Sequence, residues 1–259
     1  MIKQTIYLNQ IEPFIDKDII KIITGIRRSG KSVLLQQIQT ELVKRGKKQA
    51  NFIYMNFENL QYEALLDYRD LNQELVKRIE QIDGKAYLFL DEIQKVASWE
   101  KTINSLRASY DCDIYITGSN SQLLSGELAT EIAGRYVEIK VYPFYFAEFL
   151  EAINSDRQNL DRDFATYMEL GGMPFLTLIY SDQQACNTYL QDIYSSVVLK
   201  DIVDRHAIRN VDLLQRITSY LSSEIGYPVS ATGIAKFLKN EHRTSSIDTI
   251  LDYISYTCD

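Results

Sequence analysis

The first 150 residues contain short apolar runs separated by segments with helical spacing. Residues 32–45 and 71–82 repeat apolar side chains every three or four positions, which is typical of amphipathic helices. Nearly continuous apolar runs predict strands at residues 19–24, 51–57, 87–90, 113–117 and 137–141. Strands of this kind are buried on both faces, and their alternation with helices indicates a parallel sheet. The sequence therefore predicts an α/β domain.

Helical spacing continues without strands after Pro143. A polar, charged stretch at residues 154–163 has the composition of a linker. Helices are then predicted on both sides of a break at Gly171, Gly172 and Pro174. Three more helices are predicted at residues 213–223, 231–238 and 245–256. We therefore expect three parts, which span residues 1–153, 154–210 and 211–259.

Composition narrows the class of protein. The 259 residues carry a formal net charge of −7 and are 46% apolar, which indicates a folded protein and disfavours a general, charge-driven binder of nucleic acid or membranes. Three distant cysteines and two histidines disfavour a disulfide framework or a zinc site. No signal peptide is recognisable and no apolar run reaches the ~18 residues of a membrane span, so we expect a cytoplasmic protein with no membrane partner.

Residues 25–32 carry the most specific motif. Their sequence GIRRSGKS matches G-x-x-x-x-G-K-[ST], with a predicted strand before it and a predicted helix after it. In such a loop, backbone N–H groups point at phosphate oxygens, the lysine faces the β and γ phosphates, and the serine hydroxyl can bind Mg2+. The alternative is an ordinary turn between a strand and a helix. The predicted nucleotide-binding residues are Gly25, Ile26, Arg27, Arg28, Ser29, Gly30, Lys31, Ser32 and Val33.

The two arginines of this loop need a separate explanation. Their side chains are not required for phosphate binding in the motif, which uses the backbone, the lysine and the serine. We therefore assign Arg27 and Arg28 no catalytic role, and we expect their side chains to be solvated or paired with acidic neighbours.

An acidic pair, Asp91 and Glu92, follows the apolar run at residues 87–90. Because the carboxyl ends of parallel strands border the ligand crevice, Asp91 is predicted to hold the hydration shell of Mg2+ together with Ser32 as metal ligand. Glu92 is predicted to polarise the water that attacks the γ-phosphate. Capping of a helix N-terminus is the alternative role for such a pair. A base beside the metal ligand favours water as acceptor, and therefore an ATPase over a kinase or a GTPase switch.

Two further residues are catalytic candidates. The strand at residues 113–117 is expected to lie between the other two strands of the site, which would bring Asn120, or alternatively Ser119, towards the attacking water; a plain polar turn is the other interpretation. Arg135 stands at a Gly-Arg turn before the strand at residues 137–141. It is predicted to act as an arginine finger, usually from a neighbouring subunit, or else to form a surface salt bridge.

Together these segments resemble the AAA+ superfamily of P-loop ATPases, and within it a prokaryotic group whose phosphate loop reads G-x-R-R-x-G-K-[ST]. The matching segments are GIRRSGKS, YLFLDEIQKV, ITGSNSQLLS, LATEIAGRYVEIKVYPFYFAEF and YMELGGMPF. The resemblance implies an ATPase core at residues 1–153, a helical lid at 154–210 and a winged-helix-like segment at 211–259, with ATP and Mg2+ as cofactors. Members usually continue into a nuclease-like C-terminal domain, so we expect this chain to be a short form or a truncated one.

DNA is a further predicted partner, because residues 229–254 match the helix-turn-helix pattern of this group. Between residues 230 and 247, Lys236, Lys239 and Arg243 outnumber the single acidic Glu241. So few basic residues would support only weak, salt-sensitive binding to DNA phosphates. A packing or regulatory module is the alternative.

The main functional hypothesis is an AAA+ switch or motor that binds and hydrolyses ATP with Mg2+, and that forms a homo-oligomer if Arg135 acts between subunits. One alternative is a nucleotide-regulated interaction protein with little turnover. Another is a small-molecule phosphotransferase, although the sequence contains no recognisable acceptor pocket. The client and the cellular process do not follow from these residues.

Overall fold

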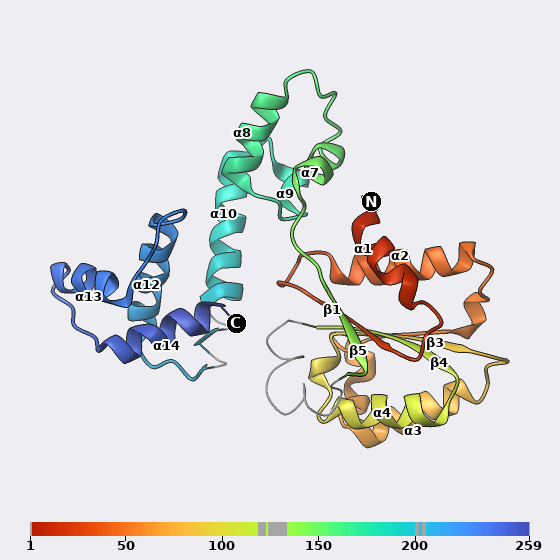
Figure 1. The fold of residues 1–259 in the computed structure, drawn as a ribbon. Coiled ribbons are helices and arrows are strands. Elements are labelled where there is room, and N and C mark those ends of the chain that lie inside the picture. Colours follow the sequence, from red (N-terminus) through yellow and green to blue (C-terminus); the bar gives the residue numbers. More distant parts are fainter. Residues whose placement is uncertain (1, 119–122, 124–133, 200–201, 204–205, 259) are drawn as a thin grey trace. The chain divides into compact units, whose positions relative to one another are not determined.

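The computed structural model describes residues 2–118, 123, 134–199, 202–203 and 206–258 (Figure 1). The chain divides into two compact units, Met1–Tyr180 and Ser181–Asp259. Each unit has its own buried core, and each is described separately below.

A parallel sheet forms the centre of the first unit. Among the described residues, five strands pair side by side in the order β2-β3-β4-β1-β5, and every pairing is parallel. The strands are β1 (Ile20–Thr24), β2 (Phe52–Asn56), β3 (Ala86–Asp91), β4 (Cys112–Thr117) and β5 (Tyr136–Lys140). Each strand overlaps one predicted apolar run, and β4 lies between β1 and β3 as expected. The predicted α/β fold is therefore confirmed.

Helices cover both faces of this sheet (Figure 1). One face packs against α1 (Thr5–Ile11) and α2 (Lys31–Lys44), and the other against α3 (Tyr68–Ile79) and α4 (Trp99–Ser109). Short turns of 3-10 helix join these elements at η1 (Glu12–Phe14), η2 (Gln49–Asn51), η3 (Leu60–Leu65) and η4 (Ile93–Lys95). Because both faces are covered, β1, β3 and β4 are buried along nearly their whole length, whereas the edge strands β2 and β5 are only partly buried.

Helices α1 and α4 were not predicted from the sequence. Helix α4 nevertheless carries Trp99, Ile103 and Leu106 at helical spacing, and these side chains are at most 2% exposed. Helix α1 has seven residues and buries only Tyr7 and Ile11, a pattern too short to stand out in a sequence.

Three helices follow β5, namely α7 (Phe146–Ala152), α8 (Leu160–Leu170) and α9 (Leu176–Ile179). Helix α8 begins inside the stretch that we expected to be a linker, because the Asn159 side chain accepts a hydrogen bond from Arg162 N at 3.1 Å and caps the helix. The irregular stretch is therefore shorter than predicted.

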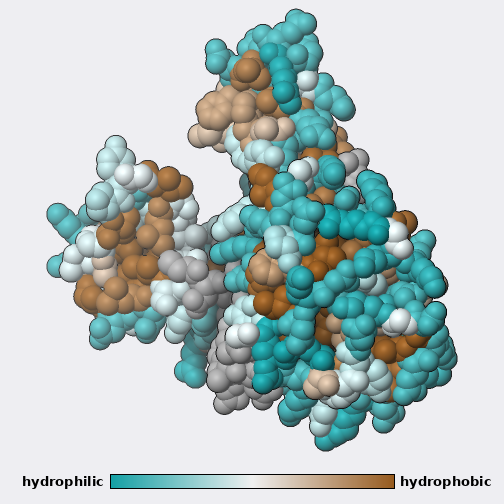
Figure 2. All heavy atoms as spheres, turned by 45° about the vertical axis from the view of Figure 1, so that its right-hand side comes forward, coloured by the Kyte–Doolittle hydropathy of each residue, from teal (hydrophilic) through white to brown (hydrophobic). Residues whose placement is uncertain are grey.

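Helix α8 also keeps an apolar stripe in solvent. Leu160, Phe164 and Met168 lie on one face of the helix and are 46%, 47% and 67% exposed. Apolar surface is visible in this region at the top of Figure 2.

The second unit consists of helices around a small core. Its elements are α10 (Gln183–Ile193), the π-helix η5 (Tyr194–Leu199), α12 (Val211–Ser223), α13 (Ala231–Asn240) and α14 (Ile247–Cys258). Leu214, Ile217, Ile234 and Ile250 are fully buried between α12, α13 and α14. The three helices predicted at the end of the chain are therefore confirmed, and Ser230 caps α13 by accepting from Gly233 N at 3.1 Å.

The assignments of a lid at residues 154–210 and of a winged helix at 211–259 stay predictions. None of the described helices is long and apolar enough to cross a membrane.

Candidate nucleotide site

The loop at residues 25–32 connects the end of β1 to the start of α2, as the motif predicts. Its backbone takes positive φ values at Gly25 (146°), Arg28 (67°) and Gly30 (102°), which turn the chain tightly. A Cβ on Gly25 would lie 2.2 Å from Val141 O, so only glycine fits at this position. Gly30 is the N-cap of α2 and offers no side-chain acceptor, which leaves the N–H groups of the first turn for an anion.

Lys31 is buried at the first position of α2, with only 5% of its surface exposed. Its ammonium donates to Gly25 O at 3.1 Å and to Ile26 O at 3.2 Å, so the side chain folds back over the loop. Nζ also lies 3.9 Å from Glu92 Oε1. Burial lowers the pKa of Lys31, whereas the negative charge of Glu92 raises it.

Asp91 ends β3 as a fully buried carboxylate with three hydrogen-bond donors around it. Thr117 Oγ1 donates to Oδ1, while Tyr54 OH and Asn56 Nδ2 each donate to Oδ2 at 3.2 Å. Burial and the neighbouring Asp91 charge raise the pKa of Tyr54 to about 12, so its hydroxyl stays protonated and remains a donor. An ionised carboxylate has about four lone-pair positions, so one position on Oδ1 remains for a further ligand.

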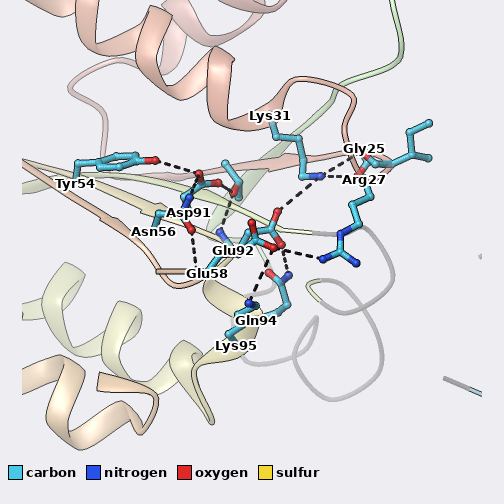
Figure 3. A network of polar contacts seen from close by, with 12 residues as sticks. Gly25, Arg27, Lys31, Tyr54, Asn56, Glu58, Asp91, Glu92, Gln94 and Lys95 are labelled. Carbon is cyan, nitrogen blue, oxygen red and sulfur yellow. Dashed lines mark hydrogen bonds and ion pairs between the residues drawn. The ribbon is translucent and has the colours of Figure 1, made fainter. Parts of the chain in front are cut away.

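Glu92 follows directly in a left-handed backbone conformation, with φ 56° and ψ 44°. Such a conformation costs a residue with a side chain about 1–2 kcal/mol. It is held by the Thr117 side chain, whose Oγ1 accepts from Glu92 N at 3.0 Å. Gln94 Nε2 donates to Glu92 Oε2 at 2.5 Å, which fixes the carboxylate facing Lys31 (Figure 3). Strained residues of this kind gather at functional sites.

Thr117 is a site residue that the sequence interpretation missed. We chose Asn120 and Ser119 from the same strand end, but both lie outside the described residues. The signal available in the sequence was that Thr117 is the last polar residue of the strand expected beside the Asp-Glu strand, where its side chain can contact both acidic residues.

Arg27 is paired with an acidic neighbour, as one of our expectations for the loop arginines states. Its guanidinium lies 3.4 Å from Glu58 Oε1, and Lys95 Nζ lies 4.0 Å from the same oxygen (Figure 3). Glu58 comes just after β2, and nothing in the linear sequence connects it to the loop.

Arg135 lies beside the amino-terminal ends of the strands, whereas this cluster lies at their carboxyl-terminal ends. Its carbonyl accepts from Ile20 N at 2.9 Å, beside the start of β1, whereas the phosphate loop begins at the end of β1. A strand of five residues spans about 16 Å at 3.3 Å per residue. Among the described residues, its guanidinium partner is Asn104 Oδ1 at 3.4 Å. Arg135 is therefore too far to reach the phosphate site of its own chain.

The residues of the loop and of β3 fit Mg-ATP. The uncapped first turn of α2, the buried ammonium of Lys31 and the buried Ser29 Oγ, which has no hydrogen-bond partner among the described residues, suit phosphate oxygens. The Ser32 hydroxyl and the remaining Asp91 lone pair are oxygen ligands, which Mg2+ prefers.

Two family models match the chain. One, described as an AAA domain, matches residues 17–150 and so covers the sheet, the loop and the acidic pair. The other, described as a domain of unknown function, matches residues 161–258.

Similar proteins occur in bacteria and archaea. An uncharacterized protein of Haemophilus influenzae is 41% identical over 256 residues, which cover 98% of this chain and 64% of that protein. An uncharacterized protein of Methanocaldococcus jannaschii is 33% identical over 250 residues, which cover 93% of this chain and 54% of that protein. The chain thus spans roughly half to two thirds of the length of these relatives.

Among solved structures, the Aeropyrum pernix ORC1 protein in complex with DNA aligns with a TM-score of 0.49 and 13% identity, covering 98% of this chain and 82% of that one. The Thermotoga maritima RuvB Holliday junction branch migration motor aligns with a TM-score of 0.46 and 15% identity, covering 98% and 87%.

Proposed function

Because the chain belongs to the AAA domain family, we propose that it is an Mg2+-dependent ATPase that acts as a molecular switch or motor. The loop at residues 25–32 binds the phosphates, Ser32 and Asp91 hold the metal, and Glu92 activates the attacking water. The observation that carries this proposal is the 3.9 Å distance between Lys31 Nζ and Glu92 Oε1, since it sets a general base beside the ammonium that would contact the γ-phosphate.

The residues of the site divide the work between them. Lys31 leaves the carbonyls of Gly25 and Ile26 to contact the β and γ phosphates, and bound Mg2+ would neutralise further phosphate charge. Glu92 accepts a proton from water at one of its carboxylate oxygens. The single hydroxyl of Thr117 binds both Asp91 and the backbone of Glu92, so the base and the metal ligand keep a fixed separation.

Single-turnover phosphate release tests the proposal. Glu92→Gln keeps the shape and the contact with Gln94 but removes the base, so phosphate release should fall about a hundredfold or more while calorimetry shows ATP affinity within about threefold of the native protein. Lys31→Ala is the control for binding, and its ATP affinity should fall about tenfold or more. A native protein that binds ATP but releases no phosphate would favour the interaction protein with little turnover.

The three-helix cluster supports a packing role better than DNA binding. Arg243, one of three basic residues behind the DNA hypothesis, is 2.8 Å from Asp212 in an ion pair. Helix α14 contains no basic residue and carries Asp248 and Asp252, which DNA phosphates would repel. It also exposes the apolar Leu251 by 51%. We therefore propose that α12–α14 is a packing or regulatory module, and that it binds DNA weakly and in a salt-sensitive way.

A further inference from the structure

Glu58 is a charged residue of the site to which the ATPase mechanism gives no role. It lies two residues beyond β2, and its N–H donates to Asn56 Oδ1 at 2.8 Å. The other end of the same amide donates to Asp91 Oδ2 at 3.2 Å. Through Asn56, the backbone of Glu58 is therefore tied to the carboxylate that would hold Mg2+.

The Glu58 carboxylate faces the phosphate loop (Figure 3). Its Oε1 binds the guanidinium of Arg27 at 3.4 Å and lies 4.0 Å from Lys95 Nζ. Glu58 thus pairs with a cation of the loop that would surround the phosphates.

The ion pair between Arg27 and Glu58 is suited to exchange. Both side chains are exposed, by 56% and 46%, so water screens their attraction and the pair is weak. Arg27 is part of the loop itself, and its planar guanidinium prefers phosphate oxygens to a single screened carboxylate oxygen. ATP offers this guanidinium one more phosphate group than ADP does.

We propose that the Glu58 carboxylate pairs with Arg27 when no triphosphate is bound. The terminal phosphate of ATP, which ADP lacks, then draws Arg27 away from Glu58. Glu58 then sets how strongly the site distinguishes ATP from ADP. This inference rests on the proposed ATP site.

Calorimetry with ATP and with ADP at low ionic strength tests the exchange. Glu58→Gln should raise ATP affinity about threefold to tenfold and ADP affinity less than about twofold, because it frees Arg27 to contact the terminal phosphate. Glu63→Gln removes the same charge from an exposed position on η3 and should change neither affinity. Arg27→Gln should weaken ATP binding more than ADP binding, and adding Glu58→Gln to it should change ATP affinity less than about twofold.

Three results would overturn the inference: no gain in ATP affinity in Glu58→Gln, an equal gain for ATP and ADP, or the same gain when Arg27 is already replaced. The first two show that Glu58 does not distinguish the terminal phosphate, and the third shows that it does not act through Arg27. Failure of the native protein to bind ATP would instead reject the proposed function itself, so the two failures are separable.

Discussion

Thr117 serves both acidic residues of the candidate site because a hydroxyl can donate and accept at once. It donates to Asp91 Oδ1 and accepts from Glu92 N at 3.0 Å, and it is fully buried. The metal ligand and the base are adjacent in sequence, yet their side chains need different directions. The left-handed turn at Glu92 provides that difference, and the Thr117 hydroxyl stabilises it.

Replacement of Thr117 by valine keeps the shape and removes the hydroxyl. Two buried polar groups then lose a partner, so Thr117→Val should lower the free energy of unfolding by about 1–3 kcal/mol. Phosphate release should fall roughly tenfold to a hundredfold, as for other residues that orient catalytic ligands. ATP affinity should change little. Thr117→Ser keeps the donor and acceptor and should restore turnover; equal turnover in native protein and Thr117→Val would reject the positioning role.

The chemistry of the site was largely predictable from sequence, whereas its pairings were not. The loop at residues 25–32 and the pair Asp91 and Glu92 follow recognisable spacing rules after apolar strands. Glu58 reaches the same place through the pairing of β2 with β3, which no feature of the sequence around it indicates. The contact between Glu58 and Arg27 joins segments that are distant in sequence, so the hydrophobic and polar pattern of either segment does not predict it.

At the scale of elements, apolar runs identified all five described strands. The central strands β1, β3 and β4 were clearest because they are buried on both faces, whereas the edge strands β2 and β5 bury only some of their residues. Short helices were harder. Helix α4 has 11 residues, and its three apolar core residues are spread among polar ones, of which Glu100 and Thr102 are also buried. Helix α8 starts at a polar cap that also resembles a linker, so composition alone misplaced its beginning.

Helix α7 contains a buried carboxylate, Glu148, whose ionisation makes the stability of the fold depend on pH. Burial raises the pKa of Glu148 above its ordinary value of 4.5. The residue is 4% exposed, and among the described residues its Oε1 has no hydrogen-bond partner. A raised carboxyl pKa stabilises the fold at pH values below 4.5, and this stabilisation is lost as pH rises through the raised pKa of the folded state.

Glu148→Gln removes the charge and keeps an acceptor for Tyr145 N, which donates to Glu148 Oε2 at 3.3 Å. The variant should therefore melt roughly a few degrees higher than the native protein at pH 8, and the gap should close as pH falls towards the ordinary carboxyl range. Thermal melts across this range measure it. Glu63→Gln, which neutralises an exposed carboxylate on η3 away from Glu148, should change the melting temperature little. A Glu148→Gln melting curve that stays below the native one at pH 8 would contradict the burial argument.

At the scale of the whole molecule, the position of Arg135 decides whether a single chain can supply an arginine finger to its own phosphate site. Its backbone pairs with the start of β1, and the phosphate loop leaves from the other end of that strand, about 16 Å away. A finger supplied within one chain is therefore ruled out by the length of β1. If Arg135 has a catalytic role, a second copy must bring its phosphate site to the amino-terminal ends of these strands, where Arg135 lies.

Arg135→Ala should then lower ATP turnover by roughly a hundredfold or more, since arginine fingers contribute about 10^3 to 10^5 in rate, while ATP affinity barely changes. Mixing Arg135→Ala with Lys31→Ala distinguishes the explanations. In a shared interface, the intact Lys31 site of one copy receives the intact Arg135 of the other, so activity should partly return on mixing and should depend on protein concentration. Arg69→Ala, which removes an exposed arginine of α3, should leave turnover unchanged and serves as the control. Normal turnover in Arg135→Ala would assign the residue to its contact with Asn104, and the chain would then hydrolyse ATP without a finger from a second copy.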